Sequence, residues 1–152
     1  MLAMMLAAAA QMAGTPAGTA AAREPVDSIA GRWITETRHG IVEITPCGAS
    51  ICGRLIDSDT IRGDPRSRDV NNKDPAQRQR PLKGLMMLQG FHADGSRGAK
   101  SLAKSWVSGS VYNPDDGGTY HGTITVVDAR TLKVRGCIVW PLCKSQVWKR
   151  VG

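Results

Sequence analysis

The sequence predicts an all-β protein, an eight-stranded antiparallel up-and-down barrel with one long loop between its third and fourth strands. Short runs rich in Ile, Val, Thr and Trp recur along the chain, and residues that favour turns separate most of them. After the leader, no stretch of helical periodicity exceeds about two turns. Sequential hairpins form a meander, and closing a meander removes its exposed edges, so a barrel is the favoured arrangement.

The leader has the pattern of an export signal. Residues 1–22 carry no charged side chain, Met1–Met12 is an apolar run, and Ala20-Ala21-Ala22 suits a cleavage site. We therefore predict a signal peptide over residues 1–22, a single barrel domain over residues 28–152, and a mature protein that is periplasmic or secreted. The apolar run is too short to span a bilayer, so no transmembrane segment is predicted in the mature chain. A disordered alanine-rich tail is the alternative, because no Lys or Arg precedes the apolar run.

The first three strands form a compact meander. Trp33–Thr37 and Ile41–Thr45 are β-type runs separated by the turn Arg38-His39-Gly40. Ile51–Ile56 follows a second turn, Pro46-Cys47-Gly48-Ala49-Ser50.

The second half of the chain repeats this pattern. In the seventh run, alternate positions from Leu132 to Ile138 give one apolar face, with Lys133 and Arg135 on the other. The five further strands are predicted at Gly84–Phe91, Trp106–Tyr112, Tyr120–Val127, Leu132–Val139 and Ser145–Val151.

A long polar stretch, Ser58–Lys83, separates the third and fourth strands. Asp74 and Pro75 predict one short helical turn with Asp74 as its N-cap. Loops of this length in compact domains are usually functional or disordered. We expect this loop to cover one barrel mouth and to supply polar contacts to a ligand or partner, and a solvated crossover is the alternative. The candidate contact residues are Asn71, Asn72, Asp74, Arg78 and Arg80.

Four cysteines flank two predicted turns, as the pairs Cys47 with Cys52 and Cys137 with Cys143. Facing residues at non-hydrogen-bonded sites of a hairpin lie about 4.5 Å apart at Cα, which is within disulfide reach. An even cysteine count after an export signal favours disulfides. We predict the two short-range bonds, while the other two pairings and a zinc site are the alternatives.

Trp33 lies in the motif Gly31-Arg32-Trp33 of the first strand, and Arg150 lies near the end of the last. These strands are neighbours in a closed barrel, so the guanidinium can stack on the indole as a structural pair. The arrangement is similar to that of lipocalins and calycins, where a Gly-x-Trp motif packs against an Arg near the end of the last strand.

A series of short motifs, in order, resembles the exported bacterial domain-of-unknown-function family 2147. The resemblance implies a lipocalin-like barrel and export, and it implies no agreed activity and no catalytic residues. The matching motifs are Gly31-Arg32-Trp33, Val42-Glu43-Ile44, Pro46-Cys47-Gly48, Ile51-Cys52-Gly53, Asp69-Val70-Asn71-Asn72, Asp74-Pro75, Arg80-Pro81-Leu82, Gly84-Leu85, Tyr112-Asn113-Pro114, Gly118-Thr119-Tyr120 and Leu132-Lys133-Val134-Arg135-Gly136.

The chain is basic, with a formal net charge of +7. Its Lys and Arg residues are scattered, and four Trp, two Tyr and one Phe are too few for a series of base-stacking platforms. A solvated basic surface is therefore the expectation, and no nucleic-acid partner is predicted.

No set of residues predicts catalysis. His39, His92 and His121 are far apart in the sequence and are expected on the surface. Glu36 and Glu43 lie on adjacent predicted strands, where a carboxylate pair can act in acid–base chemistry, but exposed strand residues are the expectation. We predict no enzyme activity, no cofactor and no metal.

Three functions are compatible with these features. An eight-stranded barrel can hold one small ligand, so the leading prediction is an exported envelope protein that binds a small apolar or amphipathic molecule in the barrel mouth. The second is an envelope interaction or stress-resistance protein with a packed barrel and no ligand. The third is an unrecognised hydrolase, which a buried carboxylate or histidine with a partner would favour.

Overall fold

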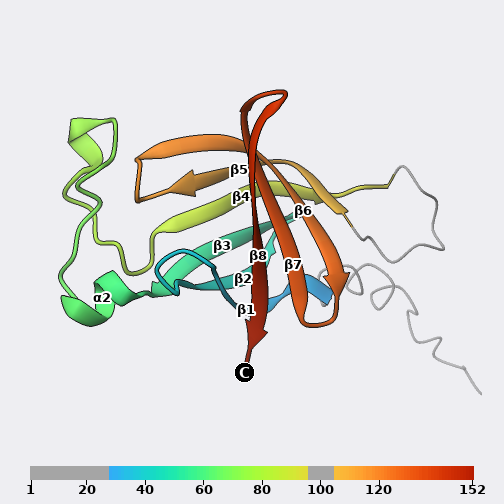
Figure 1. The fold of residues 1–152 in the computed structure, drawn as a ribbon, viewed down its shortest axis with the longest axis horizontal. Helices are drawn as coiled ribbons and strands as arrows, with labels where there is room; N and C mark the ends of the chain where they lie inside the picture. The colour runs from blue at the N-terminus through green and yellow to red at the C-terminus, as the bar shows by residue number, and fades with distance from the viewer. Residues whose placement is uncertain (1–27, 96–104) are drawn as a thin grey trace, which may run out of the picture.

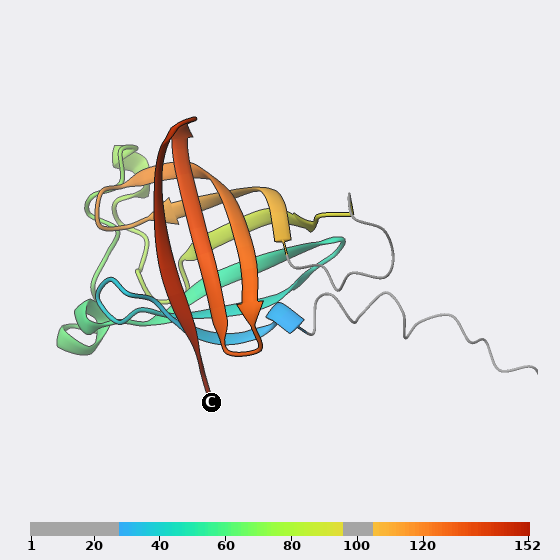
Figure 2. The same cartoon turned by 45° about the vertical axis from the view of Figure 1, so that its right-hand side comes forward.

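The computed structural model describes residues 28–95 and 105–152, which fold into a closed barrel of eight antiparallel strands (Figures 1 and 2). Each strand pairs with the next along the chain, and β8 pairs with β1. The predicted fold is confirmed, while the predicted signal peptide lies outside the described residues. In the described part, no helix has the length and apolar character needed to cross a membrane. The strands are β1 (Gly31–Ile34), β2 (Ile41–Cys47), β3 (Ser50–Asp57), β4 (Met86–Ala93), β5 (Ser105–Asn113), β6 (Gly118–Asp128), β7 (Thr131–Val139) and β8 (Leu142–Val151).

The up-and-down order places alternate connections at opposite ends of the barrel. The connections β1–β2, β3–β4, β5–β6 and β7–β8 share one end, which we call the mouth. Residues 28–30 and the β2–β3 and β6–β7 turns lie at the other end, which we call the base. The long 58–85 segment is the β3–β4 connection, so it lies at the mouth.

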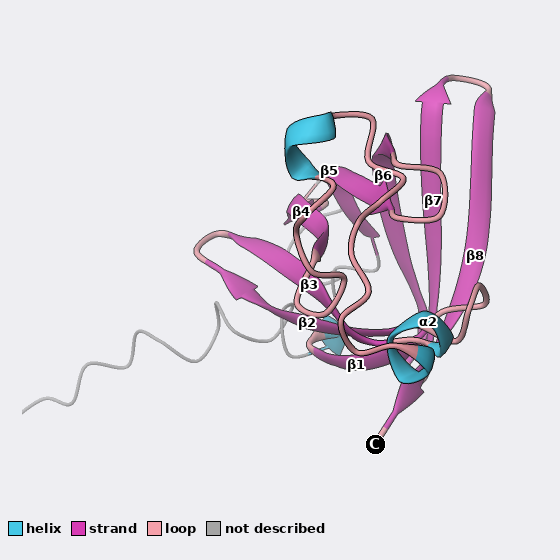
Figure 3. Ribbon diagram, turned by 90° about the vertical axis from the view of Figure 1, so that its left-hand side faces the viewer, coloured by secondary structure: helices cyan, strands magenta, loops and turns pink. Residues whose placement is uncertain are grey.

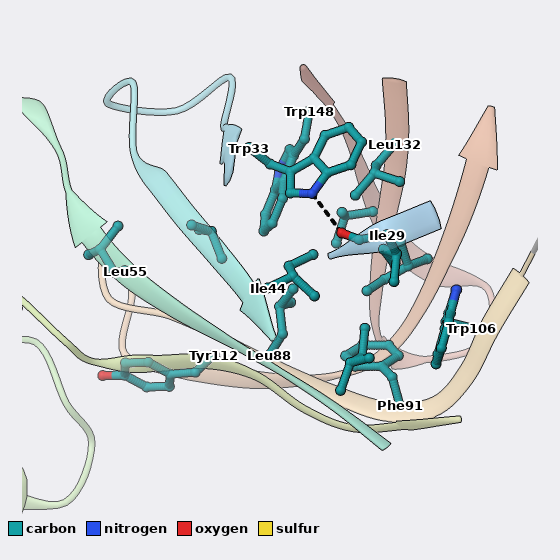
Figure 4. Close-up of a cluster of buried hydrophobic side chains, with 14 of the residues drawn as sticks. Ile29, Trp33, Ile44, Leu55, Leu88, Phe91, Trp106, Tyr112, Leu132 and Trp148 are labelled. Atoms are coloured by element: carbon teal, nitrogen blue, oxygen red, sulfur yellow. Dashed lines mark hydrogen bonds between the residues drawn. The ribbon is translucent and has the colours of Figure 1, made fainter. Parts of the chain in front are cut away.

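Aromatic side chains fill the barrel toward the base (Figure 4). The Trp33 indole N–H donates a hydrogen bond of 2.9 Å to the Ile29 carbonyl oxygen. The Phe91 ring occupies the space that a Cβ at Gly122 would need, so glycine is required there for close packing. Side chains thus leave little room for a ligand in this half of the interior. The three tryptophans buried there are Trp33, Trp106 and Trp148.

Arg150 joins the first and last strands at the base. It lies opposite Trp33 in the β1–β8 register, with its guanidinium carbon 4.2 Å from the indole centroid. The same guanidinium donates hydrogen bonds to the carbonyl oxygens of Ser28 at 2.9 Å, Ala30 at 2.8 Å and Ala129 at 2.8 Å. One side chain therefore ties together the segment before β1, the first strand and the β6–β7 turn.

Both predicted disulfides are present. Cys47–Cys52 closes the β2–β3 hairpin at the base, with Cα atoms 5.6 Å apart. Cys137–Cys143 closes the β7–β8 hairpin at the mouth, with Cα atoms 4.0 Å apart. No cysteine is left free, so the zinc alternative is wrong.

The first strand begins and ends earlier than predicted, because the chain turns directly after Ile34. The Thr35 N–H donates to the Gly40 carbonyl oxygen at 2.8 Å, and the Thr35 hydroxyl donates to the Thr37 carbonyl oxygen at 2.7 Å. Arg38 and His39 both have positive φ, at 54° and 44°. The β propensity of residues 35–37 is therefore overridden by a wider turn.

The apolar face predicted for the seventh strand is buried only in part. Leu132 and Val134 lie in the core, but Ile138 is 67% exposed. The β7–β8 register shifts between Cys137 and Val139, so the alternation is interrupted at Ile138. The hairpin formed by β7 and β8 extends past the neighbouring strands (Figure 1).

Candidate functional site

The segment 58–85, hereafter the mouth loop, crosses the mouth of the barrel (Figure 3). It contains two short helices, α2 (Asp59–Gly63) and η1 (Pro75–Gln77). The predicted turn is η1, in which the Asp74 carboxylate accepts a hydrogen bond from the Ala76 N–H at 3.0 Å. This local cap is confirmed.

Helix α2 was not predicted. The Ser58 hydroxyl caps it by accepting a hydrogen bond from the Ile61 N–H at 3.2 Å. Asp59 in the first turn and Arg62 in the last suit the helix dipole. A serine cap followed by an acidic residue was the local signal that could have revealed it.

The carboxylate of Asp69 is the centre of the mouth loop, and its side chain is fully buried. Tyr112 of β5 donates to one oxygen at 2.6 Å. The Asn72 amide and the Arg80 Nε–H donate to the other, each at 2.8 Å. The Arg80 guanidinium also lies 5.1 Å from the Tyr112 ring centroid. Burial is the main cause, and the hydrogen bond to Asp69 the second, of a rise in the pKa of Tyr112 to about 12. The phenol is therefore a stable donor that fixes the loop to the barrel wall.

A second attachment joins the mouth loop to the β5–β6 turn. The Asn71 amide donates to the carbonyl oxygens of Pro114 and Asp115, each at 3.2 Å. Gly117 has a φ of +69°, and a Cβ there would collide with the Asn71 backbone oxygen. The Asp115 carboxylate in turn pairs with Arg38 of the β1–β2 turn at 3.0 Å. Three mouth connections are thus linked in a row.

Helix α2 is held to the β1–β2 turn by a separate set of contacts. The Asp59 N–H donates to the Arg38 carbonyl oxygen at 2.9 Å, and the Asp59 carboxylate is 2.8 Å from His39 Nδ1. The pKa of Asp59 is below its usual value, mainly because of the hydrogen bond with His39 and next because of the hydrogen bond from Arg62. This carboxylate stays ionised at neutral pH and anchors the start of the loop.

A cavity of about 200 Å³ lies between the mouth loop and the barrel. The β1–β2 turn contributes Thr35 and Gly40, β3 contributes Leu55, and the mouth loop contributes Val70, Asn71 and Leu82. Leu55 and Leu82 belong to the buried core, so the apolar core forms part of the wall of this cavity. We call this space the mouth cavity.

Two further hollows lie near the mouth. A polar groove of about 520 Å³, the outer groove, lies between the mouth loop and strand residues that include Gln89 and Ser110. These two residues face each other across β4 and β5, next to the inward-facing pair Leu88 and Val111, so the groove lies on the outside of the barrel. A smaller pocket of about 100 Å³ is lined by residues of β5 to β8, including Val134.

The five predicted contact residues do not converge on one hollow. Asn71 lines the mouth cavity, whereas Asn72, Asp74 and Arg80 line the outer groove. Arg78 lines neither, and its Nε–H donates to the Asn72 carbonyl oxygen at 2.8 Å. All five make hydrogen bonds that hold the mouth loop or attach it to the barrel.

Asp69 and Tyr112 were not singled out from the sequence, although both lie in motifs of the family resemblance. A buried carboxylate with partners was the feature expected to favour a hydrolase. Here both oxygens accept hydrogen bonds, the side chain has no exposed surface, and Asp69 lines neither the mouth cavity nor the outer groove. These contacts support a structural role for Asp69 in the mouth loop.

A closed eight-stranded antiparallel barrel with a packed base and a loop-covered mouth is a lipocalin-like fold. A solved structure from the human pathogen Helicobacter pylori, described as belonging to the lipocalin family, is similar to it with a TM-score of 0.67 and 22% sequence identity, over 81% of this chain and 82% of that one. The model of a family described as "uncharacterized protein conserved in bacteria" (DUF2147) matches residues 31–150. The chain belongs to that family. No curated protein matches it significantly.

Proposed function

We propose that this protein binds a small apolar or amphipathic molecule in the mouth cavity. The observation that carries the proposal is a cavity of about 200 Å³ that lies between the barrel and the mouth loop and is lined by apolar and polar side chains. Leu55, Val70 and Leu82 supply apolar surface, while Thr35 and Asn71 supply polar groups. Pockets that combine apolar walls with a few polar groups are typical of ligand sites.

The packed base limits the size of this ligand. Pockets for drug-sized molecules measure about 300–1,000 Å³, and the mouth cavity is smaller. A short amphipathic molecule, or one end of a longer chain, is therefore the ligand class that fits. Asn71 and Arg68 line the cavity and would contact the polar end of such a ligand.

A packed barrel without a ligand is the second candidate. The observation that favours it is the burial of Trp33, Trp106 and Trp148 in the base half of the interior. The two candidates differ only in whether the mouth cavity takes up a molecule, so a binding measurement at that cavity separates them.

We also propose that the protein is exported and acts in the bacterial periplasm or outside the cell. The apolar leader supports this proposal. The two disulfides support it as well, because such bonds form and persist in oxidising compartments. We assign the Asn72, Asp74, Arg78 and Arg80 side chains to holding the mouth loop in shape.

Straight-chain alcohols of increasing length test the mouth cavity. In methyl-resolved NMR titrations, we expect short and medium alcohols to shift the methyl signals of Leu55, Val70 and Leu82. Filling the cavity by Leu55→Trp should abolish the shifts of the Val70 and Leu82 methyl signals, because the larger ring occupies the ligand's space. Leu142→Trp is the matched control, since Leu142 is exposed on the β7–β8 hairpin, and it should bind as the native protein does. An unchanged response in Leu55→Trp, or none in the native protein, would refute the mouth site.

A further inference from the structure

The β7–β8 hairpin ends in an exposed apolar tip, which we define as Ile138–Leu142. Ile138, Trp140 and Leu142 are 67%, 71% and 63% exposed. Single exposed apolar residues are common on protein surfaces, but a continuous apolar patch marks an interaction site. The tip stands at the mouth end, where β7 and β8 extend beyond the other strands (Figures 1 and 3).

The tip is held in this exposed form by covalent and stacking contacts. The Cys137–Cys143 disulfide closes the hairpin immediately behind it. The Arg135 guanidinium lies 4.6 Å from the Trp140 ring centroid. The apolar side chains are therefore presented to their surroundings by a stiff hairpin.

The surroundings of the tip are basic. The sequence contains no Asp or Glu after Asp128, so the whole β7–β8 hairpin has only cationic charges. Lys133, Arg135 and Lys144 lie on its two strands behind the tip. The neighbouring β5–β6 turn carries Asp116, but its carboxylate already accepts hydrogen bonds from the Gly118 N–H and the Tyr120 hydroxyl.

We propose that this tip docks the protein onto the surface of a bilayer that contains anionic lipid. Tryptophan favours the membrane–water interface, and its aliphatic neighbours gain by entering the boundary between headgroups and acyl chains. Arg135 and Lys144 are three and two positions from the tip and can approach lipid phosphates, and each cation near an anionic surface adds to binding.

The shape and size of the tip favour a membrane over a protein partner. A stable protein interface buries about 800 Å² on each side, and a projecting tip of five residues offers too little surface to meet that alone. Insertion into a lipid interface requires only a small apolar wedge with adjacent cations. Docking in this way does not depend on whether the mouth cavity holds a ligand.

Tryptophan fluorescence reports on this tip selectively. Of the four tryptophans, Trp33, Trp106 and Trp148 are at most 2% exposed, and Trp140 is 71% exposed. Vesicles of brominated phosphatidylcholine with phosphatidylglycerol should quench the Trp140 emission. Vesicles of brominated phosphatidylcholine alone should quench it much less, and added salt should weaken the effect.

The double variant Ile138→Ser/Leu142→Ser retains Trp140 and removes two apolar contacts, so its affinity for the anionic vesicles should fall about tenfold or more. Val127→Ser is the matched control, because Val127 is 58% exposed near the β6–β7 turn at the base, and it should bind normally. The proposal is overturned if no vesicle quenches Trp140 or if the double variant binds as well as the native protein. It is also overturned if the tip instead mediates a lipid-independent dimer in sedimentation, lost in the double variant, without any vesicle binding.

Discussion

Replacing Asp69 with alanine is expected to destabilise the protein by about 2–3 kcal/mol. The substitution leaves Tyr112, Asn72 and Arg80 without their shared acceptor. Breaking a buried ion pair usually costs about 3–5 kcal/mol, and we expect a smaller loss here because the Arg80 side chain is 36% exposed and its charge is partly screened by solvent. Urea denaturation monitored by circular dichroism measures the loss.

The same substitution should loosen the mouth loop more than the barrel. Two backbone hydrogen bonds report on the loop: the Asn72 N–H donates to the Asp69 carbonyl oxygen, and the Leu82 N–H donates to the Ser67 carbonyl oxygen. Both N–H groups should exchange their hydrogens much faster in Asp69→Ala. Tyr112→Phe is the control, because it removes one donor and keeps the carboxylate, at a cost of about 1 kcal/mol. If Asp69→Ala costs no more than Tyr112→Phe, the carboxylate is not the centre of the loop.

The substitution Arg150→Ala should also be costly, with a loss of about 2–3 kcal/mol in the free energy of unfolding. Stacking on Trp33 alone would contribute about 1 kcal/mol. The guanidinium also donates to the carbonyl oxygens of Ser28, Ala30 and Ala129, and hydrogen bonds from a charged group contribute more than neutral ones. Thermal and urea denaturation measure the loss, and a change in tryptophan emission should accompany it.

Arg32→Ala is the matched control for this prediction. Arg32 lies on β1 next to Trp33, and its ion pair with Glu43 is exposed, with side-chain exposures of 61% and 38%. Exposed pairs contribute about 0–1 kcal/mol. If Arg150→Ala destabilises the barrel no more than Arg32→Ala, then Arg150 does not tie the base together.

Features encoded locally in the sequence were predicted well. Strand alternation, turn residues and the Asp74 cap each depend on neighbours within a few positions. The Cys47–Cys52 and Cys137–Cys143 bonds are also local, because each pair flanks one hairpin turn. Trp33 and Arg150 are distant in sequence, but closure of a meander brings the first and last strands together. The Gly31-Arg32-Trp33 motif and an Arg near the end of the last strand were therefore enough to predict their contact.

Features set by distant contacts were missed or placed differently. Tyr112 and Asp69 are 43 positions apart, and no local pattern shows that they meet. Ile138 continues the apolar alternation in the sequence, but the β7–β8 register shifts between Cys137 and Val139, and no local pattern shows this irregularity. The candidate residues of the mouth loop were expected to face one ligand. The structure distributes four of the five between two hollows and uses the hydrogen bonds of all five to hold the loop.

Native mass spectrometry of the protein isolated from its own bacterial envelope tests the central claim most directly. The spectrum gives the mature mass, which also shows whether the chain is cleaved near Ala22-Arg23. Our account predicts that the native protein and Leu142→Trp carry one small bound molecule, released on activation, and that Leu55→Trp carries none. A native protein free of any bound molecule, or an equal adduct on Leu55→Trp, would contradict a ligand site in the mouth cavity.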